Sequence, residues 1–206
     1  MDHKNWKIRH LAAKSLGSLK DIRAVEPLIR ILKDDSEQFE HLIIQKAAAY
    51  SLGEIGDKKA IKPLIEALKS EIQYEAIEAL QKIGNAAVEP LIKALDNEHS
   101  NIRFNVSLIL QDIGDERAIE PLIKTFWDTC PESTLSSIKK FGFTMEQSSY
   151  IIMTITNAIR KIINRMVKKT IFSNYKPILV ETLSESDPIK FVSRISRILK
   201  ELKKDK

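Results

Sequence analysis

Residues that could catalyse a reaction or bind a metal ion are few and widely spaced in this sequence. The imidazole and thiol side chains are those of His3, His10, His41, His99 and Cys130. His3 and His10 are seven residues apart and can share a helix face, but a third ligand at a useful spacing is missing. Cys130 has no obvious basic partner, and its neighbours Trp127 and Pro131 favour a packed structural thiol over a nucleophile. We therefore predict no catalytic residue, no metal site and no cofactor.

Motifs that hold nucleotides or activate a serine are also absent from the sequence. It contains no GxxxxGK[ST] phosphate loop, no GxGxxG turn after a strand and no GxSxG elbow. Its carboxylates cannot be distinguished from the solvated charges of any helical surface. The sequence therefore predicts a protein that is not an enzyme.

Cysteine usage and the N-terminal residues indicate the compartment. One cysteine in 206 residues excludes an internal disulfide and suggests a reducing environment. The opening residues lack the basic and apolar regions of a signal peptide. No apolar run reaches the roughly 18 residues that span a bilayer. We expect a cytoplasmic protein that does not bind a membrane.

Positive charge is concentrated towards the C-terminus. Residues 131–206 carry 15 Lys and Arg against 7 Asp and Glu, whereas residues 1–130 carry 18 against 21. Two stripes of cations at helical spacing could follow a phosphate backbone. They consist of Arg160, Lys161, Arg165 and Lys168 in one helix, and of Lys190, Arg194 and Arg197 in the last. Few aromatic or amide side chains lie between them to contact bases, so a solvated helix face is the simpler interpretation and nucleic-acid binding is the alternative.

A repeated pattern positions these residues through the first two thirds of the chain. The string LGSLKDIRAVEPLIRIL at 16–32 recurs as LGEIGDKKAIKPLIEAL at 52–68 and as LQDIGDERAIEPLIKTF at 110–126. A version that is one residue shorter, LQKIGNAAVEPLIKAL, occupies 80–95. A helical segment precedes each string. Self-similarity with a period of about 20–50 residues is typical of stacked repeats.

Each repeat has the pattern of two antiparallel helices joined by a tight turn. In the second repeat, the first helix is expected to end at Gly56, because glycine adopts the left-handed conformation at little cost. Asp57 can accept backbone N–H bonds as the next helix begins, and Pro63 lies near the start of that helix, where a missing N–H costs little. The matching capping residues are Asp21, Asn85 and Asp115. Such pairs cannot bury their apolar faces alone, so neighbours must stack into an α-solenoid.

With this pattern the chain resembles the HEAT-repeat family, in particular the subclass first described in phycobilisome lyases. The resemblance rests on ϕRxxAAxxLGxIGDxRAϕxPLIxxL and covers residues 6–128. It implies an all-α, right-handed solenoid of antiparallel helix pairs. The four repeats are expected at about 6–36, 39–70, 71–98 and 100–128.

Residues 129–206 keep a helical pattern but lose the repeat strings. We interpret them as divergent, basic helical repeats that cap the solenoid, because terminal repeats are expected to be atypical. An unrelated helical domain is the alternative. Helices are expected at 131–142, at about 146–168, near Pro177 and after the N-cap pair Asp187–Pro188.

The family resemblance includes one enzyme, a hydroxylase that modifies a lysine-derived residue in a translation factor. Its iron-binding His-Glu pairs lie seven and six positions before the glycine near the end of each first helix. The matching positions here are His10–Leu11, Lys46–Ala47, Tyr74–Glu75 and Phe104–Asn105. No pair is intact, and a di-iron site needs several ligands from facing helices. We therefore reject this activity.

The lyase relatives suggest a further alternative, an accessory subunit that handles a bilin. Such a site would need an apolar cleft and groups that bind two propionates. Arg30 and Lys124 could contribute to it, although the residues shared with these relatives are scaffold positions.

The resemblance places partner binding on the concave surface, which the second helices line in HEAT-like proteins. Residues one before, three after and six after each repeat proline should point away from the core. The residue types at these positions differ between repeats, while the buried Leu and Ile residues hardly change. A surface that faces a ligand would show this difference, and so would exposed positions that are free to vary. The predicted partner-binding residues are Arg30, Lys33, Glu66, Lys69, Lys93, Lys124 and Trp127.

Trp127 stands where other repeats have Lys or Asp. We favour packing of its ring beneath the C-terminal helices, and an interface anchor is the alternative. The sequence as a whole predicts a non-catalytic scaffold that binds a protein or peptide, with nucleic acid and a bilin as the alternative ligands. It does not identify the partner or the oligomeric state.

Overall fold

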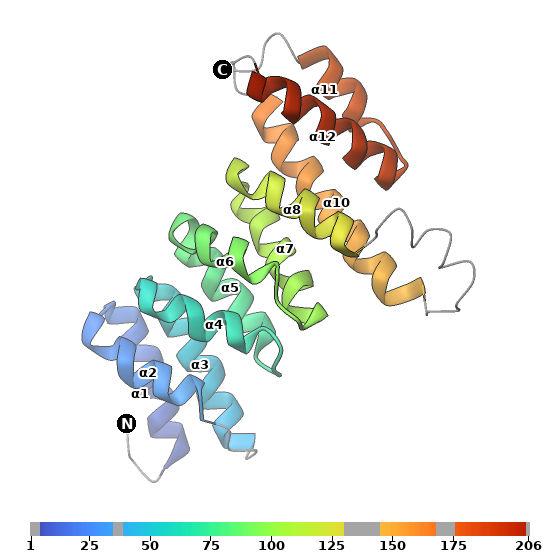
Figure 1. The fold of residues 1–206 in the computed structure, drawn as a ribbon. Coiled ribbons are helices and arrows are strands. Elements are labelled where there is room, and N and C mark those ends of the chain that lie inside the picture. The colour runs from blue at the N-terminus through green and yellow to red at the C-terminus, as the bar shows by residue number, and fades with distance from the viewer. Residues whose placement is uncertain (1–4, 35–38, 130–144, 168–175, 205–206) are drawn as a thin grey trace. The chain divides into compact units, whose positions relative to one another are not determined.

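The computed structural model describes residues 5–34, 39–129, 145–167 and 176–204, and every regular element among them is a helix (Figure 1). These residues belong to two compact units, residues 1–109 and 110–206, which are described one at a time. The α-helices of the first unit are α1 (Trp6–Leu19), α2 (Val25–Leu32), α3 (Phe39–Ile55), α4 (Ile61–Ala67), α5 (Gln73–Ile83), α6 (Val88–Ala94) and most of α7 (Ser100–Ile113).

The first unit is a stack of helix pairs, which confirms the predicted all-α solenoid. The first helices of successive repeats form one layer, in which α1 packs against α3 and α3 packs against α5. The second helices lie beside this layer, where α2 packs against α3 and α4 packs against α5. The conserved pattern of leucines within the chain's own repeats accounts for the core, since Leu28, Leu52 and Leu64 are fully buried.

Short 3-10 turns connect the two helices of each repeat. Gly56 ends α3 with a φ of 74°, and in the first repeat Lys20 takes the matching left-handed position with a φ of 53°. Asp57 Oδ1 accepts the backbone N–H of Lys59 at 2.7 Å, as predicted for a cap. The expected cap at Asn85 is not formed. The shorter third repeat begins its 3-10 turn at the preceding glycine, so Asn85 lies inside the turn instead of ahead of it.

Two glycines allow the first helices to approach closely. A Cβ added at Gly17 would lie 2.5 Å from Ser51 Cβ, and one added at Gly53 would lie 2.6 Å from Ala79 Cα. The approach also permits a buried bond in which Ser51 Oγ donates to the carbonyl of Ala13 at 2.8 Å. Helix spacing in this layer therefore depends on residues without a side chain.

The second unit contains the end of α7 followed by helices that diverge from the repeat pattern. They are α8 (Ile119–Thr129), α10 (Met145–Val167), α11 (Lys176–Leu183) and α12 (Pro188–Lys204). Helix α10 packs against α8, α11 and α12. The helices predicted at about 146–168 and near Pro177 are present as α10 and α11, whereas the helix predicted at 131–142 lies outside the described residues.

The last helix begins as its sequence predicts. Pro188 is its first residue, and Asp187 Oδ1 accepts the N–H groups of Ile189 at 2.8 Å and Lys190 at 3.1 Å. The two units meet inside α7, so the structural division does not coincide with the 128/129 limit between clear and divergent repeats. That limit, and the capping role of residues 129–206, stay predictions.

Candidate functional site

The second helices of the first unit present nine charged positions to solvent. They occupy spacing i, i+4 and i+7 on or directly after each helix, so that the three side chains of a repeat share one helix face. All nine are exposed. They are Glu26, Arg30 and Lys33 from α2, Lys62, Glu66 and Lys69 from α4, and Glu89, Lys93 and Asp96 from α6. We call this set the charge grid.

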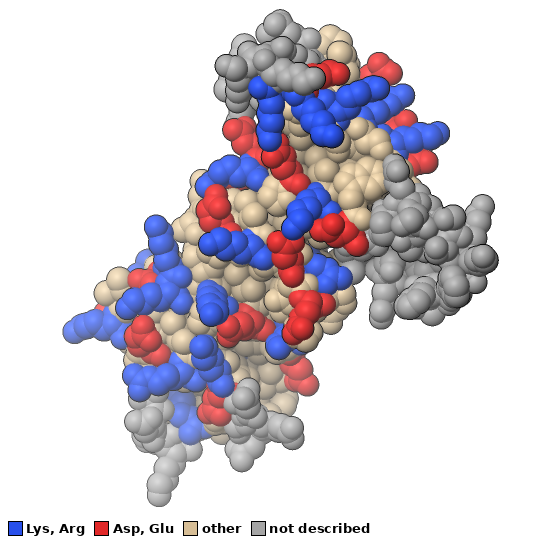
Figure 2. Space-filling model, viewed as in Figure 1, with Lys and Arg blue, Asp and Glu red and all other residues tan. Residues whose placement is uncertain are grey.

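The charge grid mixes both signs instead of forming a basic or acidic patch. It holds five cations and four anions, and the sign alternates from one repeat to the next in two of the three sets of matching positions, as in Arg30, Glu66 and Lys93. Figure 2 shows Lys and Arg interleaved with Asp and Glu over these helices. An ion pair of 3.5 Å between Lys59 Nζ and Glu26 Oε1 joins the first two repeats at its edge. Such a surface is complementary to a ligand that carries both charges.

A groove lies within the grid where the first two repeats meet. It has a volume of about 910 Å³, and three predicted site residues, Lys33, Glu66 and Lys69, line it. Apolar lining comes from residues that include Phe39, whose side chain is 73% exposed, and Pro63. The structure thus brings three predicted residues together around an apolar surface. Sequence reasoning missed Phe39, although an aromatic residue ahead of the repeat's first buried position was a usable signal.

The remaining predicted partner-binding residues, Lys124 and Trp127, lie on α8 in the second unit. Lys124 is exposed and Trp127 is half-buried. The Trp127 ring meets the fully buried Phe126 edge to face, with ring centres 5.1 Å apart. This packing leaves part of the indole accessible.

The cations of the predicted stripe on α10 have contacts within the second unit. Arg160 donates to the carbonyls of Leu183 and Glu185, the latter at 2.7 Å, and its guanidinium lies 4.5 Å from the centre of the Phe191 ring. Lys161 Nζ bonds Asp112 Oδ1 at 2.8 Å. The stripe's other members are Arg165, which donates to the Asp112 carbonyl at 3.1 Å, and Lys168, which lies outside the described residues.

The stripe on α12 is more accessible. Lys190 and Arg197 are exposed, and Arg194 lies 3.7 Å from Glu181 and 3.9 Å from Glu185. The structure therefore leaves fewer cations available to a polyanion than the sequence count indicates.

Shifted pKa values mark structural ion pairs, not catalytic groups. Side-chain and backbone hydrogen bonds from Arg23 lower the pKa of Asp21 to about 2. A side-chain hydrogen bond joins Lys82 to Glu54, which lowers the pKa of the Glu54 carboxyl and raises that of Lys82. General acids and bases need pKa values moved towards neutrality. These shifts have the opposite direction and stabilise the charged forms.

No metal site is formed by the described residues, among which no three His, Cys, Asp or Glu side chains cluster suitably. His41 instead contacts Asp34 at 3.1 Å, and Glu75 pairs with Lys46 at 3.1 Å. His3 and Cys130 lie outside the described part of the chain. Within that part, no helix is long and apolar enough to cross a membrane.

Comparison with solved structures finds several helical proteins at low identity. The chain is similar to an engineered protein, at 19% identity over 94% of this chain and 90% of that chain, with a TM-score of 0.40. A designed armadillo repeat protein in complex with the peptide (KR)4 gives 21% identity, coverage of 92% and 89%, and a TM-score of 0.38. Human deoxyhypusine hydroxylase in complex with glycerol gives 17% identity, coverage of 87% and 80%, and a TM-score of 0.29.

Comparison with protein families gives a clearer result. No curated protein matches the sequence. The model that describes HEAT repeats matches residues 1–72 and 69–138, which is well over half of the 206 residues. The chain belongs to the HEAT-repeat family.

Proposed function

We propose that the first unit is a non-catalytic platform that binds a protein or peptide partner on its second-helix face, the face expected to be concave. The observation that carries this proposal is the charge grid, whose nine exposed side chains project from three neighbouring helices. Buried leucines hold these helices in place. A rigid frame lowers the entropic cost of binding, because the charged positions need little further ordering.

The alternation of sign favours a polypeptide over a nucleic acid. A phosphate backbone would meet the anions Glu26, Glu66 and Glu89 together with the cations, and like-charge contacts oppose binding. A partner that carries both Lys or Arg and Asp or Glu can pair with both signs. Exposed charges contribute more to register and association rate than to affinity.

The groove beside Lys33, Glu66 and Lys69 supplies the apolar contact that the charges lack. Burial of apolar surface contributes about 25 cal/mol per Å², and Phe39 offers a largely exposed aromatic ring. We expect an apolar side chain of the partner to enter this groove while its charged residues align with the grid.

Two finer assignments belong to the same proposal. The LGxIGDxRA strings support placement in the phycobilisome-lyase subclass of HEAT repeats, and the low cysteine content supports a cytoplasmic location. Binding of nucleic acid by Lys190 and Arg197 on α12 is the alternative, and the experiment below includes it.

The proposal is tested by affinity capture from the source cell with and without nuclease, comparing three forms of the full chain. The grid variant carries Lys69→Glu with Lys93→Glu, and the control variant carries Lys190→Glu with Arg197→Glu. All four positions are exposed, so both variants should fold. We expect one nuclease-resistant protein to be retained by wild type and by the control, and to be lost from the grid variant. Capture that disappears with nuclease, or that only the control variant loses, would overturn the proposal.

A further inference from the structure

One repeat position is exposed in the first repeat and buried in the next three. It lies eight residues before the leucine that opens each repeated string, and isoleucine occupies it in every repeat. The exposed fractions are 46% for Ile8, 3% for Ile44, 2% for Ile72 and 2% for Ile102. Since the side chains are identical, the difference must come from what covers them.

Internal first helices are covered by two neighbours. Helix α3 contacts the preceding first helix α1 and the preceding second helix α2, and α5 likewise contacts α3 and α4. Each second helix also touches the next one, as α2 touches α4 and α4 touches α6. The exposure of Ile8 shows that the corresponding surface of α1 is not covered by the described residues.

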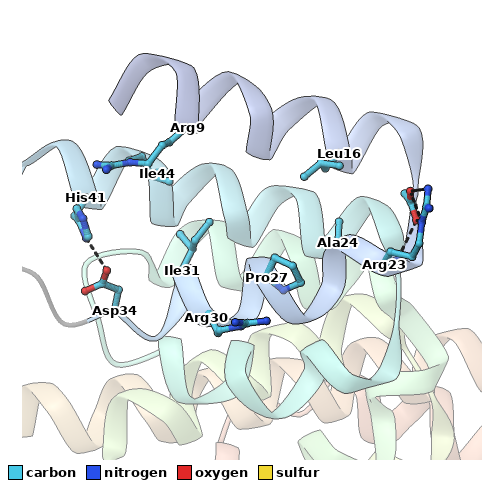
Figure 3. A pocket seen from close by; sticks show the side chains of 11 residues that line it. Arg9, Leu16, Arg23, Ala24, Pro27, Arg30, Ile31, Asp34, His41 and Ile44 are labelled. Carbon is cyan, nitrogen blue, oxygen red and sulfur yellow. Dashed lines mark hydrogen bonds and ion pairs between the residues drawn. The ribbon is translucent and has the colours of Figure 1, made fainter. Parts of the chain in front are cut away.

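A groove lies in this part of the first unit. It has a volume of about 690 Å³ and lies between α1 and α2, where Leu16 projects from α1 towards α2 (Figure 3). Its apolar lining includes Leu16, Pro27 and Ile31, all of which are half-buried. The matching residues of the second repeat are Leu52, Pro63 and Ala67, which are buried. The apolar residues that are half-buried around this groove thus have buried counterparts in the second repeat.

The charge around the groove indicates what would cover it. Helix α1 contains Lys7, Arg9 and Lys14 and no Asp or Glu. Three arginines line the groove against two aspartates, of which Asp21 pairs with Arg23 and Asp34 contacts His41. Figure 3 shows Arg23 at one end of the groove and the contact between His41 and Asp34 at the other. Among the described residues, no carboxylate forms an ion pair with Arg30.

We propose that this end groove seats an amphipathic helix with acidic flanks from a partner protein, in the position that α2 takes on α3. The chain itself provides the template, because its second helices carry an apolar face of Leu and Ile on the same kind of surface. The groove is too small for a whole helix but suits a row of its apolar side chains, while Arg23 and Arg30 face the acidic flanks. This site shares Arg30 with the charge grid, and its apolar lining, which includes Leu16 and Ile31, lies outside the grid.

The proposal is tested with a fluorescent peptide and the full chain. The probe is the segment 57–70, which spans α4, with Lys58, Lys59, Lys62 and Lys69 replaced by glutamate. The comparison peptide keeps the four lysines. We expect fluorescence anisotropy to show saturable binding of the acidic peptide with a Kd of roughly 1–100 μM, and at least about tenfold weaker binding of the lysine peptide.

Variants of the chain locate the binding. Ile31→Asp places a charge in the apolar lining and should weaken binding about tenfold or more, whereas Ile31→Leu should keep it. Arg23→Glu, whose side chain is 88% exposed, gives a second test that does not disturb the core and should also weaken binding. Lys93→Glu in the charge grid and Ile178→Asp on α11 should leave the Kd unchanged.

Several outcomes would overturn the proposal. They are equal binding of both peptides, binding that is insensitive to Ile31→Asp and Arg23→Glu, and no saturation below roughly 1 mM. Sedimentation of the chain without peptide could give a further outcome that overturns the proposal. If the wild-type chain is a dimer and Ile31→Asp makes it a monomer, the groove binds a second copy of the chain. Loss of binding in Lys93→Glu would place the peptide on the charge grid instead.

Discussion

The two units use their cations in different ways. In the first unit, Arg30 on α2 and Lys93 on α6 are exposed and contribute to a surface of mixed charge. In the second unit, which has the larger positive charge in sequence, Arg160 and Lys161 hold α10 to other parts of the same unit. The count of basic residues therefore favours the second unit as the binding region. The contacts of Arg160 and Lys161 within the second unit favour the first unit instead, because its cations on the second helices stay exposed. The half-buried guanidinium of Arg160 is occupied by these contacts and is less accessible to a ligand.

The two tryptophans allow each unit to be measured separately. The chain has only Trp6 and Trp127, one in each unit. Unfolding by urea can thus be followed through Trp6 in a Trp127→Phe background, and through Trp127 in a Trp6→Phe background. The predictions below use these reporters.

The largest expected effect concerns the close approach of first helices in the first unit. Gly53→Val would place a side chain against the backbone of Ala79, since even a Cβ there lies 2.6 Å from Ala79 Cα. We expect a loss of about 3 kcal/mol of unfolding free energy, measured by urea titration through Trp6. The matched control is Gln111→Val at the same repeat position in the second unit, where the residue is half-buried. A loss of equal size in both variants would show that the glycine has no special role in packing.

The next effect tests the structural use of cations in the second unit. Arg160→Met removes the bonds to the carbonyls of Leu183 and Glu185 and the contact with Phe191. Loss of bonds to a charged group should cost about 1.5–3 kcal/mol, measured through Trp127. Arg30→Met in the charge grid should change stability by no more than about 0.5 kcal/mol, as expected for an exposed residue. Equal costs for the two arginines would remove the proposed difference between the units.

A smaller effect of opposite sign is expected at Lys20. This residue adopts a φ of 53°, where the matching residue of the second repeat is Gly56. Lys20→Gly should stabilise the first unit by about 0.5–1 kcal/mol, because relief of the left-handed strain exceeds the added entropy of the unfolded chain. The reciprocal Gly56→Lys should destabilise it. A destabilising Lys20→Gly would contradict the assignment of Lys20 as the helix-ending residue.

The smallest effect depends on pH. The pKa of Asp21 falls from an ordinary value near 3.8 to about 2 through its bonds with Arg23. Because the carboxyl pKa is lower in the folded state, the ionised carboxylate stabilises the folded state at pH values above the pKa of the unfolded chain. This stabilisation is lost as the pH falls from about 4 to 2. Asp21→Asn keeps a capping oxygen and should lower the urea midpoint at pH 6 but not at pH 2.

Local sequence features predicted most of the fold. The repeated strings gave the order of helices, Asp57 and Asp187 cap as expected, and Pro188 begins the last helix. The failure at Asn85 has a local cause, because deletion of one residue moves it into the turn. Such a shift can be recognised only when the turn geometry is known.

The site was less predictable, because its properties depend on contacts between distant residues. The exposure of Arg30, Glu66 and Lys93 follows from helical periodicity and was predicted. The partners of Arg160 lie 23 and 25 residues away, and no sequence pattern connects them. The open groove beside Leu16 could not be predicted either, since it depends on how α1, α2 and α3 pack together and not on a residue type.

The central claim is that the partner lies across the second helices of the first unit. Amine-reactive cross-linking of the captured complex tests it most directly, because the charge grid contains Lys33, Lys62, Lys69 and Lys93, all exposed. The account predicts that cross-links from the partner concentrate on these four lysines and disappear when Lys69 and Lys93 are reversed to glutamate. Cross-links confined to the exposed lysines of the second unit, which include Lys161, Lys190 and Lys200, would contradict it.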